Sequence, residues 1–212
     1  TTSDTNVARA TAQGISAIAV IRLSGTEAIA IANKVFKGKD LEKAESHTLH
    51  FGTLMDGLRV VDEVLISVFK APRSFTSENS IEISCHGSPV IAKEIIKVLL
   101  KNGARLAEPG EFTKRAFLNG RMDLSQAEAV GDLIHAETDT ARQVALNQMR
   151  GGYSKELARL REELIHFASL VELELDFGEG DVEFAKRDDL RNLVVHIQQF
   201  IEPLITSFDQ GN

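Results

Sequence analysis

The chain has 212 residues, 43% of them hydrophobic and 26% charged, which suffices for a buried core and a solvated surface in one large or two small domains. Its net charge of -7 and pI near 5.4 argue against a broad basic face for gripping nucleic acid, because affinity for phosphates comes mainly from clustered Lys and Arg. Any RNA contact is therefore expected to be local or to be made by another part or partner.

The single cysteine, Cys85, excludes an internal disulfide and fits a reducing compartment. No apolar run approaches the roughly 18 residues needed to cross a bilayer. The first residues also lack the basic and apolar pattern of a secretion signal. We therefore expect a cytoplasmic location without membrane contact.

The N-terminal part is predicted to begin with two strands and a helix. Residues 6–10 and 16–23 have strand patterns, and the second strand is nearly all apolar, so we expect it to be buried on both faces. Ser24-Gly25 is then expected to cap a helix over residues 26–36.

A β-hairpin and a polar loop are expected next. Residues 47–54 and 58–69 form its two predicted arms, and Asp56-Gly57 between them is the sort of pair that a tight turn requires. Residues 71–79 are turn formers with one aromatic and lie between two predicted strands. Binding residues are often placed on such loops.

The sequence leaves the roles of two strand charges open. Arg22 lies near the end of the buried strand, where it either reaches solvent or occupies a cleft with an anionic partner. Glu82 lies on the polar side of a strand predicted over residues 80–85. That side is either a solvated sheet face or one wall of a cleft.

Cys85 and His86 precede a helix predicted over residues 90–101. No obvious activating base lies near Cys85 in the sequence, so a small core residue is favoured over a nucleophile. His86 could by type be an acid, a base or a ligand, but it lacks a spaced partner. A structural hydrogen-bonding role is therefore favoured for it.

A short helix is predicted after residue 110. Glu111 and Arg115 lie four residues apart in it and can pair across one helical turn. Asn119-Gly120 ends this helix, since both residues tolerate the left-handed conformation found at helix ends. Residues 120–123 are then expected to link two rigid pieces.

Beyond the linker the pattern is helical. Ser125 followed by Glu128 predicts a capping box, and Gly151-Gly152 predicts a kink or break. The predicted helices cover residues 125–137, 140–149, 154–175 and 188–208. The fold class is thus α+β over residues 1–120, followed by an all-α helical-bundle domain over residues 121–212.

Two further patterns bear on chemistry. Residues 176–183 concentrate carboxylates without the spacing of a calcium loop, so a solvated acidic loop is favoured over a metal site. The sequence also contains no G-x-x-x-x-G-K-[ST] phosphate-binding loop, no zinc-spaced Cys or His set and no nucleophile elbow. GTP hydrolysis by this chain alone is therefore not expected.

Four segments, in the same order along the chain, resemble the MnmE (TrmE) family of tRNA-modification GTPases. They are A-I-A-V-I-R-L-S-G (residues 17–25), A-P-R-S-F-T-S-E-N-S-I-E-I-S-C-H-G-S-P (71–89), A-R-L-A-E-P-G-E-F-T (104–113) and G-E-F-T-K-R-A-F-L-N-G-R-M-D-L-S-Q-A-E-A-V-G-D-L-I (110–134). The last segment joins the N-terminal and helical domains in that family, so the resemblance implies the same two domains here.

The resemblance implies that the N-terminal domain has the folate-binding fold of aminomethyltransferases, forms a homodimer and binds a 5-formyl-tetrahydrofolate-type one-carbon carrier. The residues that match the family's folate contacts are Arg22 in R-[IL]-S-G, Glu82 in E-[IL]-x-x-H-G and Arg121 in N-[DG]-[KR]-x-D-L. These types suit a folate, because a carboxylate can accept from the pterin edge and guanidinium groups can bind the ring carbonyl and the glutamyl tail.

The family acts with a flavin-containing partner, MnmG (GidA), to add an aminomethyl-type group to carbon 5 of the wobble uridine of tRNA. Family members are GTP hydrolases that use GTP, Mg2+ and K+ in a domain inserted within the helical domain. That insert is expected to begin shortly after a helix like the one at residues 188–208. Without the helices beyond it, we expect exposure, self-association or disorder of the last two helices.

Two other functions compete with this one. In a purely structural dimerisation and docking module, Arg22, Glu82 and Arg121 only hold the domains together by ion pairs. A free-standing folate-dependent aminomethyltransferase is disfavoured, because the helical half resembles the GTPase family and not the companion domains of a transferase.

Overall fold

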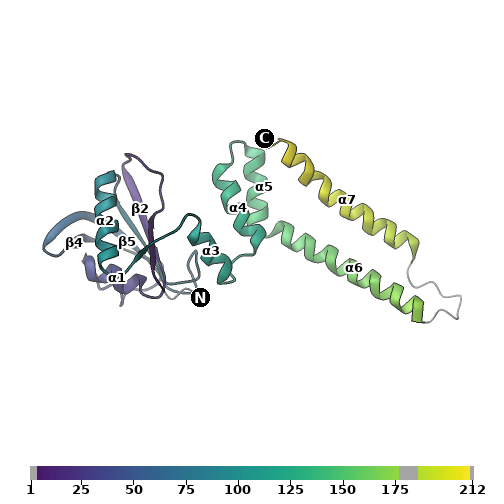
Figure 1. Ribbon diagram of the computed structural model, residues 1–212, viewed down its shortest axis with the longest axis horizontal. Helices are drawn as coiled ribbons and strands as arrows, with labels where there is room; N and C mark the ends of the chain where they lie inside the picture. Colours follow the sequence, from purple (N-terminus) through teal and green to yellow (C-terminus); the bar gives the residue numbers. More distant parts are fainter. Residues whose placement is uncertain (1–3, 177–185, 211–212) are drawn as a thin grey trace. The chain divides into compact units, whose positions relative to one another are not determined.

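The computed structural model describes residues 4–176 and 186–210, and the chain divides after Met122 into two compact units (Figure 1). In order, the elements of the N-terminal unit are β1 (Asn6–Arg9), β2 (Ile18–Ser24), α1 (Ala28–Val35), β3 (Phe36–Lys37), β4 (Thr48–Asp56), β5 (Arg59–Phe69), β6 (Ser80–His86), α2 (Pro89–Lys101), β7 (Arg105–Leu106) and α3 (Glu111–Leu118). The mixed α+β character predicted for this part is confirmed.

The strands form one seven-stranded sheet in the order β3-β4-β5-β6-β2-β1-β7. All neighbours are antiparallel except β1 and β7, which run parallel. The hairpin of β4 and β5 turns at Gly57-Leu58, where Gly57 has a φ of 62°, a value that favours glycine in a two-residue turn. The predicted hairpin is thus confirmed, with its turn just after Asp56.

Helices α1 and α2 share one core with one face of the sheet. Alternate residues of the central strands are buried against the helices; the shared core includes Ile21, Leu23, Ile66, Ile81 and Ile83 of the strands and Ile31, Ile95 and Leu99 of the helices. On the opposite face Leu49, Phe51 and Leu65 are exposed. Two-sided burial of the second strand was therefore a wrong expectation: Ile18 of β2 is exposed, because neither helix covers that face.

The start of α1 also differs from the sequence-based expectation. Its N-cap is Glu27, and no side chain caps the helix. Ser24 is instead the last residue of β2, and its hydroxyl bonds to Thr76 and Glu78. The serine therefore satisfies polar groups of the loop over residues 71–79 and does not cap the helix.

The second unit begins at Asp123, and its described residues form helices joined by short connections, without a strand. It contains α4 (Leu124–His135), α5 (Asp139–Met149), α6 (Gly152–Asp176) and α7 (Arg187–Gln210). The predicted break at Gly151-Gly152 is confirmed, since Gly151 has a φ of 80° between α5 and α6. The acidic loop predicted after Asp176 lies outside the described residues.

The capping box of α4 is formed by other residues than Ser125 and Glu128. The Asp123 carboxylate accepts from the Gln126 amide at 2.8 Å, and the Gln126 side chain accepts from the Asp123 amide at 2.9 Å. Both reciprocal bonds of a capping box are thus made two residues earlier than expected. Ser125 lies inside the helix.

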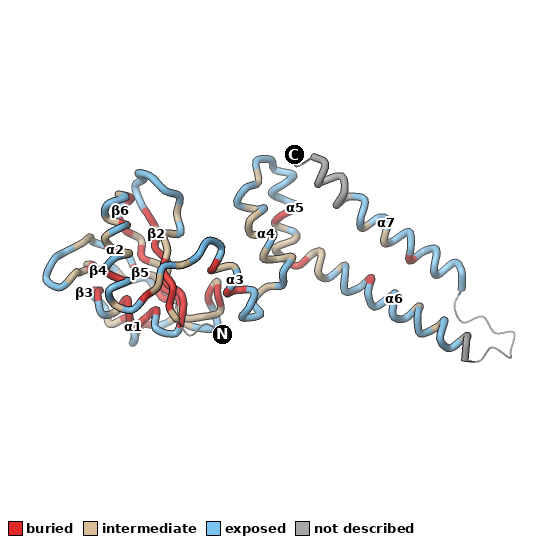
Figure 2. Tube along the Cα trace, viewed as in Figure 1, coloured by how far each residue is buried: buried red, intermediate tan, exposed pale blue. Residues whose placement is uncertain are grey.

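Few apolar side chains of the helical unit are buried. Among its residues with described side chains, only Ala129, Ala145, Leu160 and Leu193 are buried hydrophobics. Figure 2 shows α6 and α7 as mostly exposed, and Leu157, Leu164, Leu190 and Val194 are among their exposed apolar residues. The expected exposure of these two helices is confirmed for the described side chains.

Candidate functional site

A cavity of about 490 Å³ opens in the N-terminal unit. It lies against the loop over residues 71–79, the ends of β5 and β6, and the residues after α3. Its lining residues are His47, Phe69, Pro72, Arg73, Ser74, Phe75, Ser80, Glu82 and Arg121. Segments far apart in the sequence therefore supply one concave site with acidic, basic and aromatic side chains.

Glu82 forms an ion pair with Arg22. The two residues face each other across β2 and β6, and Nε and one terminal nitrogen of Arg22 donate to Glu82 Oε1 at 3.0 and 2.7 Å. Their side chains are half-buried, with 23% and 29% exposed. Both bonds go to Oε1, so Glu82 Oε2 has no hydrogen bond from the described residues.

This geometry decides between the alternative roles that the sequence left open for Arg22 and for Glu82. Arg22 has an anionic partner, and Glu82 lines a cavity and does not lie on a plain solvated face. Arg22 does not line the cavity; it contacts Glu82 from the neighbouring strand β2.

Aromatic rings pack against the two arginines. The Phe75 ring centroid lies 5.1 Å from Arg22 Cζ and 5.9 Å from Arg121 Cζ, and the Phe112 centroid lies 5.4 Å from Arg22 Cζ. A guanidinium within about 6 Å of a ring centroid is attracted by the ring quadrupole. Phe75 therefore helps to hold both cations beside the cavity.

Arg121 lies in the N-terminal unit, although its position follows the boundary predicted after residue 120. Its Nε donates to the carbonyl oxygen of Ser74 at 2.7 Å. Its terminal nitrogens make no hydrogen bond with a described residue. They remain able to donate to an anionic or carbonyl group in the cavity.

Of the nine lining residues, the sequence predicted only Glu82 and Arg121 as site residues, and three of the other seven have side chains that could contact a ligand. Arg73 is exposed and has no ion pair within the described residues, and Phe75 contacts both arginines. Both belong to the loop that turn-forming residues had marked as a binding segment. His47 has a φ of 65°, rare for a residue with a side chain, and packs edge-on against Phe69; no sequence pattern indicates this.

His86 and Cys85 have the structural roles that the sequence favours. His86 Nδ1 lies 2.8 Å from Asp62 Oδ1, and its backbone amide donates to Asp62 Oδ2 at 2.9 Å. Neither His86 nor Cys85 lines the cavity. The Cys85 thiol is buried, and this burial raises its pKa to about 11, so it is a poor nucleophile at neutral pH.

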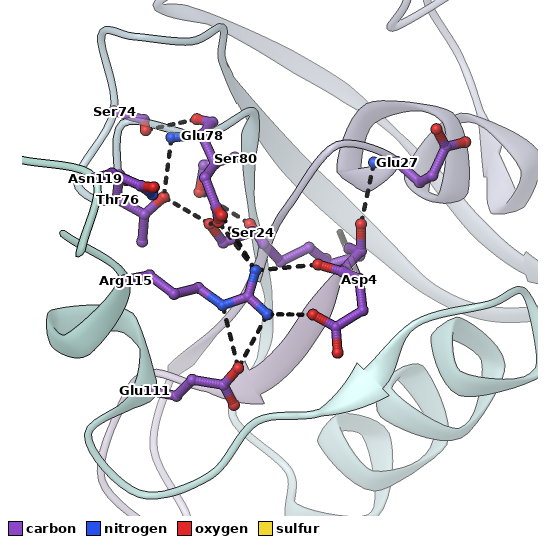
Figure 3. Close-up of polar contacts among 12 residues, drawn as sticks. Asp4, Ser24, Glu27, Ser74, Thr76, Glu78, Ser80, Glu111, Arg115 and Asn119 are labelled. Carbon is purple, nitrogen blue, oxygen red and sulfur yellow. Dashed lines mark hydrogen bonds and ion pairs between the residues drawn. The ribbon is translucent and has the colours of Figure 1, made fainter. Parts of the chain in front are cut away.

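A partly buried network of charges, centred on the buried side chains of Glu111 and Arg115, lies next to the cavity loop (Figure 3). The Arg115 guanidinium donates to Glu111 Oε1 at 3.0 Å, to Asp4 Oδ1 at 2.7 Å and to Glu78 Oε2 at 3.1 Å. The predicted pairing of Glu111 with Arg115 is thus confirmed. Arg105 joins the network by donating to Asp4 and Glu111.

The network changes the acidity of Glu111. Burial acts to raise its pKa, but hydrogen bonds from Arg105, the Glu108 amide and Arg115 outweigh burial and lower the pKa to about 2. Glu111 is therefore ionised throughout the physiological range.

Residues 4–176 and 186–210 contain no group of three or more His, Cys, Asp or Glu side chains that could hold a metal ion. Within the same residues, no helix is both long enough and apolar enough to span a membrane.

Comparison with known proteins gives the family. Residues 5–121 match the model described as the N-terminus of the GTP-binding protein TrmE, and residues 124–212 match the MnmE helical domain. Proteins named tRNA modification GTPase MnmE from Cytophaga hutchinsonii and Flavobacterium psychrophilum are each 58% identical to this chain, and that of Bacteroides thetaiotaomicron is 54% identical. Each match covers 99% of this chain but only 46% of the relative.

The chain thus spans about half the length of the curated relatives that it matches. The two matched models meet between residues 121 and 124, next to the division of the structure after Met122. The chain therefore belongs to the MnmE (TrmE) family of tRNA modification GTPases and contains that family's N-terminal and helical domains.

Proposed function

We propose that the cavity of the N-terminal unit binds a 5-formyl-tetrahydrofolate-type one-carbon carrier. The observation that carries this proposal is the convergence of Glu82 and Arg121 on one cavity of about 490 Å³. A cavity of this size falls in the range of small-molecule sites, about 300–1,000 Å³. A second supporting observation is that Glu82 Oε2 and the terminal nitrogens of Arg121 have no hydrogen bonds to described residues.

The chemistry of the ligand matches this arrangement. The pterin ring of a reduced folate presents amide and amino N–H donors along one edge, which Glu82 can accept through its free oxygen. The glutamyl tail carries carboxylates, which Arg121 and the exposed Arg73 can bind. Arg22 orients the Glu82 carboxylate through their ion pair, and it remains a predicted ligand contact.

We propose further that the whole protein works with MnmG to add an aminomethyl-type group to carbon 5 of the wobble uridine, at the expense of GTP. The names of the relatives support tRNA modification and GTPase activity. GTP, Mg2+ and K+ would bind through a domain outside the matched segments, and tRNA would be bound by the complex with MnmG. The net charge of -7 favours this indirect binding of tRNA.

We also propose that the N-terminal unit forms a homodimer in solution. Leu49, Phe51 and Leu65 are exposed side by side on the sheet face that α1 and α2 leave uncovered. Contiguous apolar surface of this kind is typical of protein interfaces. Light scattering on the chain, with Phe51→Ser as the variant, tests this proposal: the wild type is expected to be dimeric and the variant monomeric.

A structural module without a ligand is the second candidate. One observation favours it, namely the direct bond between Arg22 and Glu82. In this candidate the ion pair has a purely structural role and fixes β2 against β6. In that case the charges would satisfy each other and no small molecule would bind.

Titration of the chain with 5-formyl-tetrahydrofolate separates the two candidates. The wild type is expected to bind saturably, and Glu82→Gln, which keeps the side-chain size, is expected to weaken binding at least about tenfold, the loss typical of a charged hydrogen bond. Its thermal unfolding temperature should change little. Glu63→Gln, an exposed carboxylate on β5, is the matched control and should bind like the wild type.

The ion-pair module gives the opposite pattern. Glu82→Gln would lower the unfolding temperature, and no saturable binding of the folate would be measured with any of the three proteins.

A further inference from the structure

The segment from Arg115 to Arg121 contacts the cavity loop over residues 71–79 at three points. Arg115 donates to the Glu78 carboxylate at 3.1 Å, Asn119 donates to the Thr76 carbonyl at 2.8 Å, and Arg121 donates to the Ser74 carbonyl at 2.7 Å. Residues 115, 119 and 121 therefore contact residues 78, 76 and 74 in turn, so the two segments run in opposite directions. Figure 3 shows the Asn119 and Arg115 contacts together.

The middle contact satisfies a buried backbone group. Thr76 is fully buried, and Asn119 is the described partner of its carbonyl oxygen. A buried carbonyl without a hydrogen bond is costly. The loop also has no regular secondary structure, and Ser77 has a φ of 61°, which is unfavourable for a residue with a side chain. Hydrogen bonds within the loop, such as the one from the Ser74 hydroxyl to the Glu78 carbonyl, fix part of its conformation, and the bonds made from outside the loop add to them.

The same loop supplies the largest share of the cavity wall, namely Pro72, Arg73, Ser74 and Phe75. A shift of its backbone would move the Phe75 ring away from both arginines and would alter the space that a ligand needs. A preformed wall lowers the cost of binding, because the ligand need not order the loop.

We propose that Asn119 is a positioning residue of the ligand site: it fixes the loop over residues 71–79 in the conformation that binds the ligand, without touching the ligand itself. The inference deepens the proposed folate function and depends on it for the identity of the ligand. Arg115 anchors one end of the loop, and Arg121 anchors the other while keeping its terminal nitrogens for the ligand.

The chain offers a matched control for this role. Asn102 is the C-cap residue of α2, as Asn119 is the C-cap residue of α3, and each is followed by a glycine. The Asn102 side chain donates within its own helix, to the Val98 carbonyl at 2.8 Å. Substitution of either asparagine therefore removes one side-chain bond at a helix end, but only Asn119 contacts the cavity loop.

The experiment compares Asn119→Ala and Asn119→Asp with Asn102→Ala and Asn102→Asp in the 212-residue chain. The Asp variants keep the side-chain shape, replace the donor by an acceptor oxygen and add one negative charge at either position, and they cover the case in which an Ala variant fails to fold. Calorimetric titration with 5-formyl-tetrahydrofolate and amide hydrogen exchange of residues 71–79 are measured on each protein, together with the unfolding temperature.

Asn119 variants are expected to bind the folate about five- to tenfold more weakly, the loss of roughly one hydrogen bond. Their amides over residues 71–79 should exchange faster by a similar factor, and saturating folate should restore the protection. Asn102 variants should keep wild-type affinity and wild-type exchange in this loop. Comparable unfolding temperatures in the two sets would show that the effect is local.

Two results would overturn the proposal: wild-type exchange of the loop in the Asn119 variants, or equal weakening of binding in both sets. A wild-type chain that binds no folate would instead refute the proposed function. The positioning role is then decided by exchange alone, since selective loosening of the loop in the Asn119 variants supports it and unchanged exchange contradicts it.

Discussion

Arg115 forms ion pairs with three carboxylates. Only 3% of its side chain is exposed, and the carboxylates of Asp4, Glu78 and Glu111 all accept from its guanidinium. Removing one partner of a buried ion pair leaves a buried charge without compensation, and loss of Arg115 would do this mainly to Glu78, since Arg105 still pairs with Asp4 and Glu111. The network therefore makes the N-terminal unit sensitive to one substitution.

Arg115→Met, which keeps most of the apolar length, is expected to lower the free energy of unfolding by about 3–5 kcal/mol. Urea denaturation of the variant and the wild type measures this change. Arg59→Ala is the control, because Arg59 is exposed and its pairs with Asp56 and Glu94 are solvated; its unfolding free energy should be nearly unchanged. Equal losses in the two variants would contradict a special role for burial.

Through Glu111, the same network makes the stability of the fold depend on pH. Its pKa is about 2 in the folded protein, against an ordinary value of 4.5. A carboxyl group with a lowered folded-state pKa stabilises the fold above its unfolded pKa, and this contribution disappears as the pH falls through the folded pKa. The contribution of Glu111, on the order of 3 kcal/mol, should therefore be lost between about pH 4.5 and pH 2.

The test is a pair of stability profiles from pH 7 to pH 2 for the wild type and Glu111→Gln. The wild type should be more stable at pH 7, and the two profiles should converge in the acid range. Other lowered carboxyl groups such as Glu94 are present in both proteins, so the difference between profiles isolates Glu111. A difference that stays constant with pH would show that Glu111 acts by packing and not by charge.

At the scale of elements, the start of α4 shows how a local pattern can be displaced. Ser125 and Glu128 have the residue types and spacing of a capping box, but Asp123 and Gln126 form it. Both sets fit the same rule, because Asp is as good an N-cap as Ser and Gln can replace Glu at the third position. Asp123 also accepts a hydrogen bond from the Ser154 hydroxyl. Ser154 lies far from Asp123 in the sequence, so no local pattern predicts this bond.

Asp123→Ala is therefore expected to destabilise the helical unit by about 1 kcal/mol, the usual cost of losing an N-cap. Ser125→Ala should cost less, since the Ser125 hydroxyl only accepts a bond of 3.3 Å from Gln148. Thermal unfolding followed by circular dichroism measures both. A greater loss of stability in Ser125→Ala than in Asp123→Ala would indicate that Ser125, and not Asp123, caps α4.

At the scale of the whole molecule, the two units differ in how much apolar surface they bury. The contiguous core that the structure describes lies in the N-terminal unit, whereas few of the described apolar side chains of the helical unit are buried. Burial of apolar area is the main favourable contribution to folding. The helical unit should therefore unfold at a lower denaturant concentration than the N-terminal unit.

Two probes distinguish the units in one urea titration. Circular dichroism at the helix minimum reports mainly on α4 to α7, and modification of Cys85 by a thiol reagent reports on the N-terminal core, where its side chain is buried. The helical signal is expected to fall first, with Cys85 still protected. Coincident transitions would mean that the chain unfolds as one cooperative unit.

Local sequence patterns were enough to predict most of the helices and strands, and longer motifs were enough to predict the family. Alternating apolar residues gave β4, β5 and β6, helical periodicity gave α2 and α4 to α7, and Asn-Gly pairs gave the ends of α2 and α3. These signals are local, so they depend on neighbours within a few residues. Motifs over residues 17–134 gave the family, and the matched family models bear it out.

Which face of each helix or strand is covered, and by which other segment, is known only from the tertiary structure. Ile18 is apolar but exposed, because no layer covers its side of β2, and Ser24 bonds to a loop fifty residues away in preference to the next helix. The cavity depends in the same way on long-range placement, since the pairing of β2 with β6 and the contacts of Asn119 and Arg121 with residues 74 and 76 bring its walls together. Sequence patterns record which face of an element is apolar, but only the packed chain fixes the partner of that face.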